Sequence, residues 1–489
     1  MEASPRDSFT DHPLAASRPR TLWMVWFGLG VGLGALWTVG WWQTVLKRAP
    51  QSDVWWSLVL GRWQWQHHTL YRLNTLGHLT APYPDLEWGW QVFLAALTPR
   101  SLPGLGTLGL LVVSAGVLTV LVAEQARRLY GPSLLGPVLG ALAALGLASA
   151  WPLRPQILSV SFWLLLLMIL DQAPHHPRRL WLLVPLAVLW SVFHGDWILV
   201  PLLVFFETGR TLMTRSSPRL SPLLLGLVGL SSLVAVWRLN PLHGQAIRHA
   251  LAIIHSPVIS QVIQEWQSPN WHTPGWTLLA GLWAVIIGAV ALRRLTVTPW
   301  FWWWGGTVLA TLWHQRMVLY NWPLTLLLLG GLFPPMSALT GARQRIWSLG
   351  LVSGSAVVIL TRILTPGGVA QYATAMHSPT AVVQWCVHHP TSGLTLTPYR
   401  LGGYWEAQGV SAVWIDGRTQ FWTVHHRLGP YLAWQQGRQP VTFWTAHDVS
   451  RIVWPTTATT PQTLWLEQAH WHPVYRGDGL TVWQPSLVP

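Results

Sequence analysis

The stretch GLGTLGLLVVSAGVLTVLVA, residues 104–123, contains no charged side chain and is followed within a few residues by Arg127 and Arg128. A helix of about 20 apolar residues is long enough to cross the hydrocarbon core of a bilayer. A basic pair directly after such a helix is typical of its cytoplasmic end. This segment therefore predicts a membrane-spanning helix and also its orientation.

Similar apolar runs recur along most of the chain, which has 489 residues, 51% of them hydrophobic and only 9% charged. An ordinary soluble domain has about 25% charged residues. We therefore expect a mainly α membrane protein, a polytopic helical bundle of about ten or eleven spans. The runs lie at 22–46, 104–123, 133–150, 156–170, 180–194, 196–208, 220–238, 275–292, 299–313, 317–334 and 346–364.

The chain changes character after about residue 365, where short alternating stretches and the turn signals Asp416-Gly417 and Asp478-Gly479 replace the long apolar runs. We expect a small C-terminal exoplasmic domain, α/β or β-rich, at 366–489. The body at 21–365 would be transmembrane, with an exoplasmic first loop at 47–87, and residues 1–20 would form a cytoplasmic tail.

The basic residues set the orientation of the body. If the N-terminus is cytoplasmic, the clusters all fall inside, as the positive-inside rule expects. The formal charge of +14 is therefore interpreted as membrane topology rather than as a nucleic-acid surface. We expect a multi-pass protein of the cell membrane. The clusters are Arg18/Arg20, Arg127/Arg128, Arg178/Arg179, Arg210/Arg215/Arg219, Arg293/Arg294 and Arg343/Arg345.

The stretch 180–208 allows two interpretations. It forms either two short spans around His194-Gly195-Asp196 or a re-entrant hairpin, and both leave its flanks cytoplasmic. The single cysteine, Cys386, excludes an internal disulfide and reads as a buried, inert thiol. Metal-binding cysteine spacings are absent from the sequence.

The exoplasmic first loop contains three carboxylates. Asp53 follows the first span directly, and Asp85 and Glu87 close the loop. A carboxylate held at the membrane surface is a candidate general base for a hydroxyl acceptor. The alternative is that Asp53 caps a helix starting at Val54, and that Asp85 and Glu87 cap and anchor the next helical run.

Two arginines lie at exoplasmic span ends, against the positive-inside trend: Arg154, before Gln156, and Arg316. A guanidinium forms paired hydrogen bonds with phosphate. Snorkelling without a ligand is the alternative for each arginine alone. Both fall on the face that carries His194 and Asp196, and this shared face favours a lipid-phosphate pocket.

The segment from Asn240 to Glu265-Trp266 carries several basic residues on a moderately apolar stretch, and it predicts a helix lying in the membrane interface over the pocket. His243 and His249 are six residues apart and do not share a helix face, so a metal site built on that pair is disfavoured.

Several short motifs, in their order, resemble a group of bacterial multi-spanning glycosyltransferases of the GT-C type, related to protein mannosyltransferases that use dolichyl-phosphate mannose and to arabinosyltransferase-like enzymes. The resemblance covers residues 20 to 425. It rests on Asp53-Val54-Trp55-Trp56, Gly61-Arg62-Trp63, Glu87-Trp88 with Gln91, Arg154-Pro155-Gln156, Trp190 with His194-Gly195, Asn240-Pro241, Glu265-Trp266, Arg316 with Pro323, Tyr399, Gly402-Gly403-Tyr404 and Ile415-Asp416-Gly417-Arg418.

The resemblance implies inverting transfer of a sugar from a polyprenyl-phosphate carrier to an exoplasmic glycan, lipid or protein. It makes Asp53 the catalytic base, and the place of Glu87 at the end of the first loop makes it a candidate second catalytic acid. Arg154 and Arg316 are candidates to hold the developing negative charge, and a bound divalent metal, Mg²⁺ or Mn²⁺, is the alternative. The expected substrate-binding residues are Arg62, Asp85, Arg154, Gln156, His194, Asp196, Glu265 and Arg316.

Three positions depart from the pattern of the group. Ser57 replaces a histidine, Asn74 replaces an aspartate and Leu86 replaces a polar residue. These losses remove possible metal ligands, so a metal-free site or a catalytically degenerate member are both open. Asp416 and Arg418 either shape an acceptor site or only form a turn, and the turn is favoured.

Two other classes remain as alternatives. A transporter or flippase of polyprenyl-linked sugars would also place Arg, His and Asp inside a many-span body. The sequence lacks the internal repeats typical of transporters, which favours the enzyme. A non-catalytic scaffold presenting the C-terminal part is the third interpretation, and the outward arginines disfavour it.

Overall fold

The computed structural model describes residues 52–74, 79–98, 103–131, 135–148, 153–214, 221–254, 263–333, 379–410, 412–456 and 460–486, together with short pieces within 27–43 and 346–358. The expected cytoplasmic tail at 1–20 lies outside the described residues. Most of the expected spans at 22–46 and 346–364 lies outside them as well.

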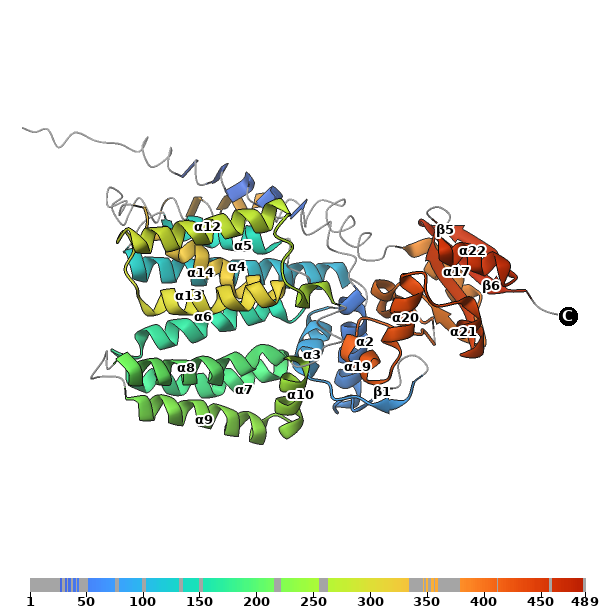
Figure 1. The fold of residues 1–489 in the computed structure, drawn as a ribbon, viewed down its shortest axis with the longest axis horizontal. Helices are drawn as coiled ribbons and strands as arrows, with labels where there is room; N and C mark the ends of the chain where they lie inside the picture. Colours follow the sequence, from blue (N-terminus) through green and yellow to red (C-terminus); the bar gives the residue numbers. More distant parts are fainter. Residues whose placement is uncertain are drawn as a thin grey trace, which may run out of the picture.

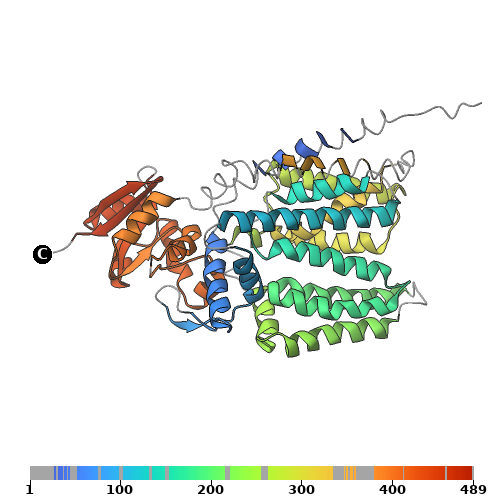
Figure 2. The ribbon, with the colours of Figure 1, turned by 180° about the vertical axis from the view of Figure 1, so that it is seen from behind.

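The body is a bundle of helices whose axes run roughly parallel, and the C-terminal part lies beyond one end of that bundle (Figures 1 and 2). We call the end of the bundle that faces the C-terminal part the site end, because the candidate functional site described below lies there. The body helices are α4 Pro103–Tyr130, α5 Leu135–Ala148, α6 Gln156–Gln172, η1 Pro177–Leu182, α7 Leu183–Phe193, η2 Gly195–Ile198, α8 Leu199–Thr214, α9 Pro222–Leu239, α10 Gly244–Ile254, η3 Gln264–Trp266, α12 Pro274–Ala291, α13 Pro299–Trp313, η4 Gln315–Met317 and α14 Val318–Gly330.

The expected fold class is confirmed: each apolar run predicted between 104 and 334 contains a helix of the bundle. In the described part of the chain, three helices are long and apolar enough to cross a membrane by length and composition: Gly106–Tyr130, Pro222–Leu239 and Pro274–Ala291. The others are shorter than the roughly 20 residues that a span needs. The number of spans and the orientation therefore stay predictions.

Large apolar side chains cover the outside of the bundle. Val113 and Val120 of α4 are 62% and 65% exposed, Leu223 of α9 is 73% exposed and Leu278 of α12 is 63% exposed. Large apolar side chains exposed on several helices are unfavourable in water and are matched by lipid tails. The helical body is therefore that of a membrane protein.

Tryptophans at the start of α13 pack inside the bundle. Trp300 Nε1 donates to Asp171 at 2.8 Å, and Trp303 Nε1 donates to Glu207 at 2.7 Å. A run of tryptophans such as Trp302, Trp303 and Trp304 is typical of a span end at the membrane interface. Only Trp302 is exposed, at 51%, since the other two are buried. Indole donors that satisfy buried carboxylates explain part of the high tryptophan content.

The C-terminal part is α/β, one of the two expected forms. Its four-stranded sheet has the order β3-β4-β6-β5, with β3 parallel to β4 and the other pairs antiparallel. Buried tryptophans dominate its core. The elements are α17 Thr380–His388, β3 Leu394–Leu396, η5 Tyr399–Leu401, α18 Gly402–Ala407, α19 Thr419–Val424, α20 Leu428–Gln435, α21 Val441–Ala446, β4 Val449–Pro455, α22 Pro461–Gln468, β5 Trp471–Gly477 and β6 Leu480–Pro485.

The first loop and the helix that follows it form a layer between the bundle and the C-terminal part (Figure 1). It contains α2 Ser52–His67, the short antiparallel pair β1 Leu73–Asn74 and β2 Ala81–Pro82, and α3 Trp88–Leu97. One face of α2 packs on α3 and another face packs on α18. This layer carries the acidic residues of the first loop to the site end of the bundle.

The contact between α2 and α3 depends on a glycine. A Cβ atom at Gly61 would lie 2.0 Å from the carbonyl oxygen of Gln91 and 3.0 Å from the Cβ of Ala95. The two backbones therefore touch at a point where any larger side chain would separate them.

We expect Gly61→Ala to destabilise the protein by about 1 to 3 kcal/mol, because the methyl group forces α2 and α3 apart. Gly116→Ala is the matched control, since nothing lies within 4 Å of its added Cβ and alanine favours the helix. Thermal unfolding in nanodiscs measures the difference. Equal melting temperatures for the two variants would contradict the close packing.

Candidate functional site

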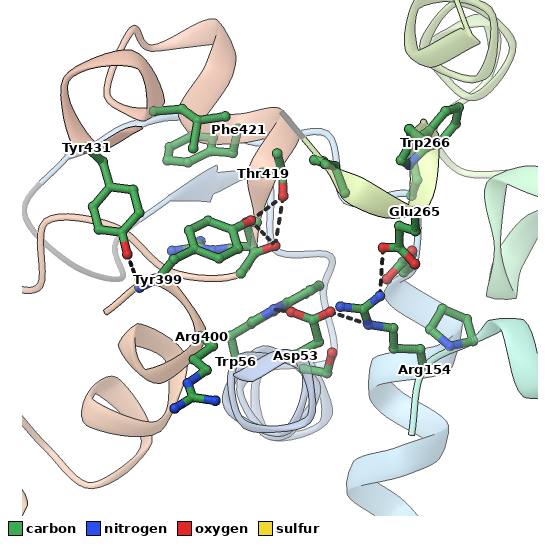
Figure 3. A pocket seen from close by; sticks show the side chains of 18 of the residues that line it. Asp53, Trp56, Arg154, Glu265, Trp266, Tyr399, Arg400, Thr419, Phe421 and Tyr431 are labelled. Atoms are coloured by element: carbon green, nitrogen blue, oxygen red, sulfur yellow. Dashed lines mark hydrogen bonds and ion pairs between the residues drawn. The ribbon is translucent and has the colours of Figure 1, made fainter. Parts of the chain in front are cut away.

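A cavity of about 710 Å³ lies at the site end, where the helical body, the first loop and the C-terminal part meet (Figure 3). Every residue that the sequence proposed for catalysis or substrate binding lines this cavity, except Arg62. The residues brought together are Asp53, Asp85, Glu87, Arg154, Gln156, His194, Asp196, Glu265 and Arg316.

Arg154 joins two carboxylates from distant segments. Its guanidinium forms an ion pair with Asp53 through Nε, and Nη1 donates to Glu265 Oε1 at 2.8 Å. Figure 3 shows the guanidinium between the two acids. Burial opposes the charge of Glu265, but Arg154 and Arg316 outweigh it and lower the pKa of that carboxyl. Asp53 and Glu265 are thus both held by one cation.

Asp53 lies in the first turn of α2, which begins at Ser52 rather than at Val54. Its carboxylate pairs with Arg154 and accepts a hydrogen bond from Trp56 Nε1 at 3.2 Å. The alternative sequence interpretation made Asp53 the cap of a helix starting at Val54. The carboxylate instead faces the cavity, held by a cation and an indole donor.

Arg316 is held less tightly than Arg154. Its Nη2 lies 3.7 Å from Asp196 Oδ2, and its guanidinium carbon lies 4.5 Å from the ring centre of Trp266. Tyr320 donates a hydrogen bond to the same Asp196 oxygen. The distance to Asp196 is too long for a hydrogen bond, so the guanidinium keeps donors for a ligand in the cavity.

His194 lies between two acids that line the cavity, Asp196 and Glu87. Its Nδ1 lies 3.1 Å from Asp196 Oδ2, and its Nε2 lies 3.8 Å from Glu87 Oε1. Burial opposes the charge of Asp196, but His194 and Arg316 lower its pKa. Burial raises the pKa of Glu87; His194 opposes that shift and Asp53 adds to it. Glu87 is therefore more basic than an ordinary glutamate.

The local backbone explains the position of His194. α7 ends at Phe193, His194 is extended, and η2 then leads into α8. The break places His194 and Asp196 at the site end of two neighbouring helices, as both sequence interpretations of 180–208 required. Whether each helix crosses the bilayer stays open.

Asp85 is buried in a shell of amide donors. Gln91 Nε2 donates to it at 2.7 Å, Gln64 Nε2 at 3.1 Å and the backbone N–H of Glu87 at 3.2 Å. Burial, with the charge of Glu87, raises the pKa of Asp85 to about 8, although the amide hydrogen bonds oppose the shift. Asp85 therefore fixes the backbone that carries Glu87.

Sequence reasoning left open whether the C-terminal part contributes to the site, and that part supplies the opposite wall. Tyr399 and Thr419 hydrogen bond to each other and line the cavity, with Arg400, Phe421 and Tyr431 beside them (Figure 3). Tyr399 was quoted in the family resemblance, but nothing in the sequence indicated which face it would adopt.

Arg418 connects this wall to the first loop. It is 4% exposed, pairs with the fully buried Asp416, and its Nη1 donates to Asn74 Oδ1 at 2.5 Å. Burial and the nearby Asp416 raise the pKa of Glu406, 3.9 Å from Arg418. The favoured interpretation of Asp416 and Arg418 as only a turn is therefore incomplete, and Asn74 is a structural partner.

Arg62 does not line the cavity. It lies two and a half turns beyond Asp53 on α2, which places it on the opposite face of that helix. Its Nη2 lies 3.4 Å from the carbonyl oxygen of Thr98. Its expected role in substrate binding stays an untested prediction.

The side chains that the structure describes do not fit a divalent-metal site. Within the described ranges, no group of three His, Cys, Asp or Glu side chains lies close enough to hold a metal ion. Arg154 already occupies Asp53 and Glu265, and Ser57 lines the cavity where the family pattern has a histidine. The local positive charge comes from arginines, so no metal enters the mechanism proposed below.

Comparison with known proteins leaves the family open. No protein-family model matches the chain, and no curated protein matches it. Among solved structures, it is similar to the crystal structure of the Archaeoglobus fulgidus oligosaccharyltransferase in complex with Zn and sulfate. The TM-score is 0.43 and the identity 10%, covering 93% of this chain and 73% of that one. A likeness this weak carries no inference about the reaction.

The raised pKa of Asp85 predicts a pH dependence of stability. A carboxyl with a pKa of about 8 in the folded state and 3.8 as its ordinary value binds a proton on folding. Its contribution is full below the ordinary value and is lost as the pH rises toward 8, by at most about 1.4 kcal/mol per pH unit.

We expect the melting temperature of Asp85→Asn to fall less between about pH 5 and pH 8 than that of the wild type, because asparagine binds no proton. Thermal unfolding in nanodiscs over this range measures it. Parallel curves for the two proteins would show that Asp85 is ionised throughout.

We expect Arg418→Met to destabilise the protein by about 3 to 5 kcal/mol, because Asp416 loses its buried cation. Arg438→Met is the control, since Arg438 is exposed and its loss should change stability by less than about 0.5 kcal/mol. Denaturant unfolding, followed by tryptophan fluorescence, compares them. Equal midpoints would contradict the structural role of Arg418.

Proposed function

We propose that this protein transfers a sugar from a polyprenyl-phosphate carrier to an acceptor hydroxyl outside the cytoplasm, with inversion at the sugar carbon. The observation that supports it most is the meeting of carboxylates and arginines in one cavity at the end of a lipid-facing bundle. A lipid-borne phosphate needs cations at that depth, and an acceptor hydroxyl needs a base beside them.

In this proposal Asp53 accepts the proton of the acceptor hydroxyl. The acceptor oxygen forms its bond to the anomeric carbon from the face opposite the phosphate. The bond between that carbon and the phosphate oxygen breaks, and the polyprenyl phosphate leaves with one more negative charge. Glu87, whose pKa is raised, stands beside Asp53 as a second proton acceptor.

The two arginines have different roles in the proposal. Arg316 binds the leaving phosphate, since its guanidinium stacks on Trp266 and makes no short contact with Asp196. Arg154 is a positioning residue, because it is engaged by Asp53 and Glu265. Lysine would be a poor substitute for Arg154, because its compact ammonium lacks the planar fork that reaches Asp53 through Nε and Glu265 through Nη1.

Transfer of radiolabelled sugar from a panel of polyprenyl-phosphate donors tests the proposal. We expect activity in the wild type and a loss of roughly a hundredfold to ten-thousandfold in Asp53→Asn, the usual contribution of a general base. Asp448→Asn is the matched control, since Asp448 is exposed and does not line the cavity.

Equal activity of Asp53→Asn and the wild type, at equal folded amounts, would remove Asp53 from the mechanism. Absence of transfer from every donor would reject the transferase and favour the transporter, flippase or degenerate interpretations.

The arginine roles give a separate prediction. Arg316→Gln should weaken binding of the sugar-free polyprenyl phosphate roughly tenfold or more, since a charge-assisted contact is worth about 1.5 to 3 kcal/mol. Arg154→Gln should lower kcat and leave that dissociation constant nearly unchanged. Equilibrium binding in nanodiscs, with the kinetics, distinguishes them, and the reverse pattern would exchange the two roles.

A further inference from the structure

A second cavity, of about 520 Å³, lies between the first loop and α10. Its lining contains the basic residues Arg72, His243 and Arg248, the polar residue Gln245, and Tyr83, but no carboxylate. The cavity is therefore cationic, whereas the lining of the main cavity contains both arginines and carboxylates.

The charges of this second cavity are uncompensated within the described residues. Neither Arg72 nor Arg248 forms an ion pair with a described carboxylate, and both are exposed. The Nδ1 of His243 lies 3.0 Å from the carbonyl oxygen of Trp237, so Nδ1 carries the proton and donates. Cations gathered without a counter-charge repel each other, and an anion between them relieves that repulsion.

The position of α10 indicates where the anion comes from. α10 runs across the site end of α7, α8 and α9 and packs against α9 and η2 (Figure 1). Leu251, 46% exposed, lies one turn from Arg248, so the outward surface of α10 joins a charge to an apolar side chain. A helix with this pattern at the end of membrane helices lies in the headgroup region.

We propose that this second cavity binds the phosphate of an anionic phospholipid headgroup from the leaflet at the site end. Arg72 and Arg248 form charge-assisted hydrogen bonds with the phosphate oxygens, and the acyl chains pass over Leu251 into the bilayer. A zwitterionic headgroup brings its own ammonium group and binds less well. This site does not depend on the proposed glycosyl transfer.

The bound headgroup would also support the main cavity. Pro82, Tyr83 and Pro84 line both cavities, and they directly precede Asp85. Tyr83 further lies over Arg418, whose guanidinium carbon is 5.5 Å from the ring centre. A lipid held on one side of this wall therefore orders the segment that carries Asp85 and Glu87 on the other side.

The test compares retention of phosphatidylglycerol and phosphatidylcholine by the full chain after mild delipidation, measured by mass spectrometry. The wild type should retain phosphatidylglycerol preferentially. The double variant Arg72→Gln/Arg248→Gln should lose roughly 30-fold of that preference, since each arginine near an anionic surface contributes about 1 kcal/mol.

Arg293→Gln/Arg294→Gln is the matched control, because it removes the same charge beyond the other end of α12. It should keep the wild-type preference. Equal loss in both double variants would reduce the effect to general attraction by the membrane. Absence of a preference in the wild type, or an unchanged preference in Arg72→Gln/Arg248→Gln, would also overturn the site.

A second measurement needs no variant and so does not depend on folding. Phenylglyoxal modification of the wild type is compared in nanodiscs of phosphatidylcholine with and without phosphatidylglycerol. The anionic lipid should protect Arg72 and Arg248 but not Arg293. Equal modification in both bilayers would overturn the proposal. Inorganic phosphate is also added to nanodiscs of phosphatidylcholine alone. If it protects Arg72 and Arg248 as well as phosphatidylglycerol does, the lipid is not the source of the bound phosphate, and the proposal is overturned.

Discussion

The ion pairs of Arg154 join the parts of the site. The arginine precedes α6, while its two partners come from the start of α2 and from η3. Three segments that are far apart in the sequence therefore converge on a single guanidinium. A charge at this depth is costly unless it is paired. The pairing fixes Asp53 and Glu265 relative to each other and leaves Arg316 as the cation with donors to spare.

The first loop and the C-terminal part depend on a second buried cation. Arg418 holds Asp416 in its own domain and Asn74 in the first loop, so it fastens the acid-bearing layer to the wall that carries Tyr399. The two arginines hold the first loop from opposite sides. Arg154 connects it to the helical bundle, and Arg418 connects it to the C-terminal part. The cavity lies between an ion pair on the bundle side and a hydrogen bond from a cation on the side of the C-terminal part.

The sequence predicted the helices of the body well, because apolar runs and arginine positions are local signals. It also selected the charged residues of the first loop and the body that line the cavity, since Asp53, Arg154 and Arg316 stand out as charges at span ends. It could not predict the partner of each charge. Asn74 was interpreted as a lost acid and Arg418 as part of a turn, yet they bind each other across 344 residues of sequence.

Two other features also could not be predicted from the sequence, because they too depend on how the helices assemble. Arg62 belongs to a motif beside Asp53, but the helical period turns it to the opposite face of α2. Trp303 of α13 donates to a buried carboxylate, and composition alone does not distinguish an indole facing lipid from one facing a buried acid. Periodicity determines elements and faces, whereas long-range pairing depends on the assembled fold.

The most direct test of this account is a cryo-electron microscopy structure of the wild type with a bound, non-transferable polyprenyl-phosphate sugar. The account predicts that the phosphate lies against Arg316 and Trp266, with the sugar between it and Asp53. A phosphate bound away from Arg316, or a sugar whose anomeric carbon faces away from Asp53, would contradict it.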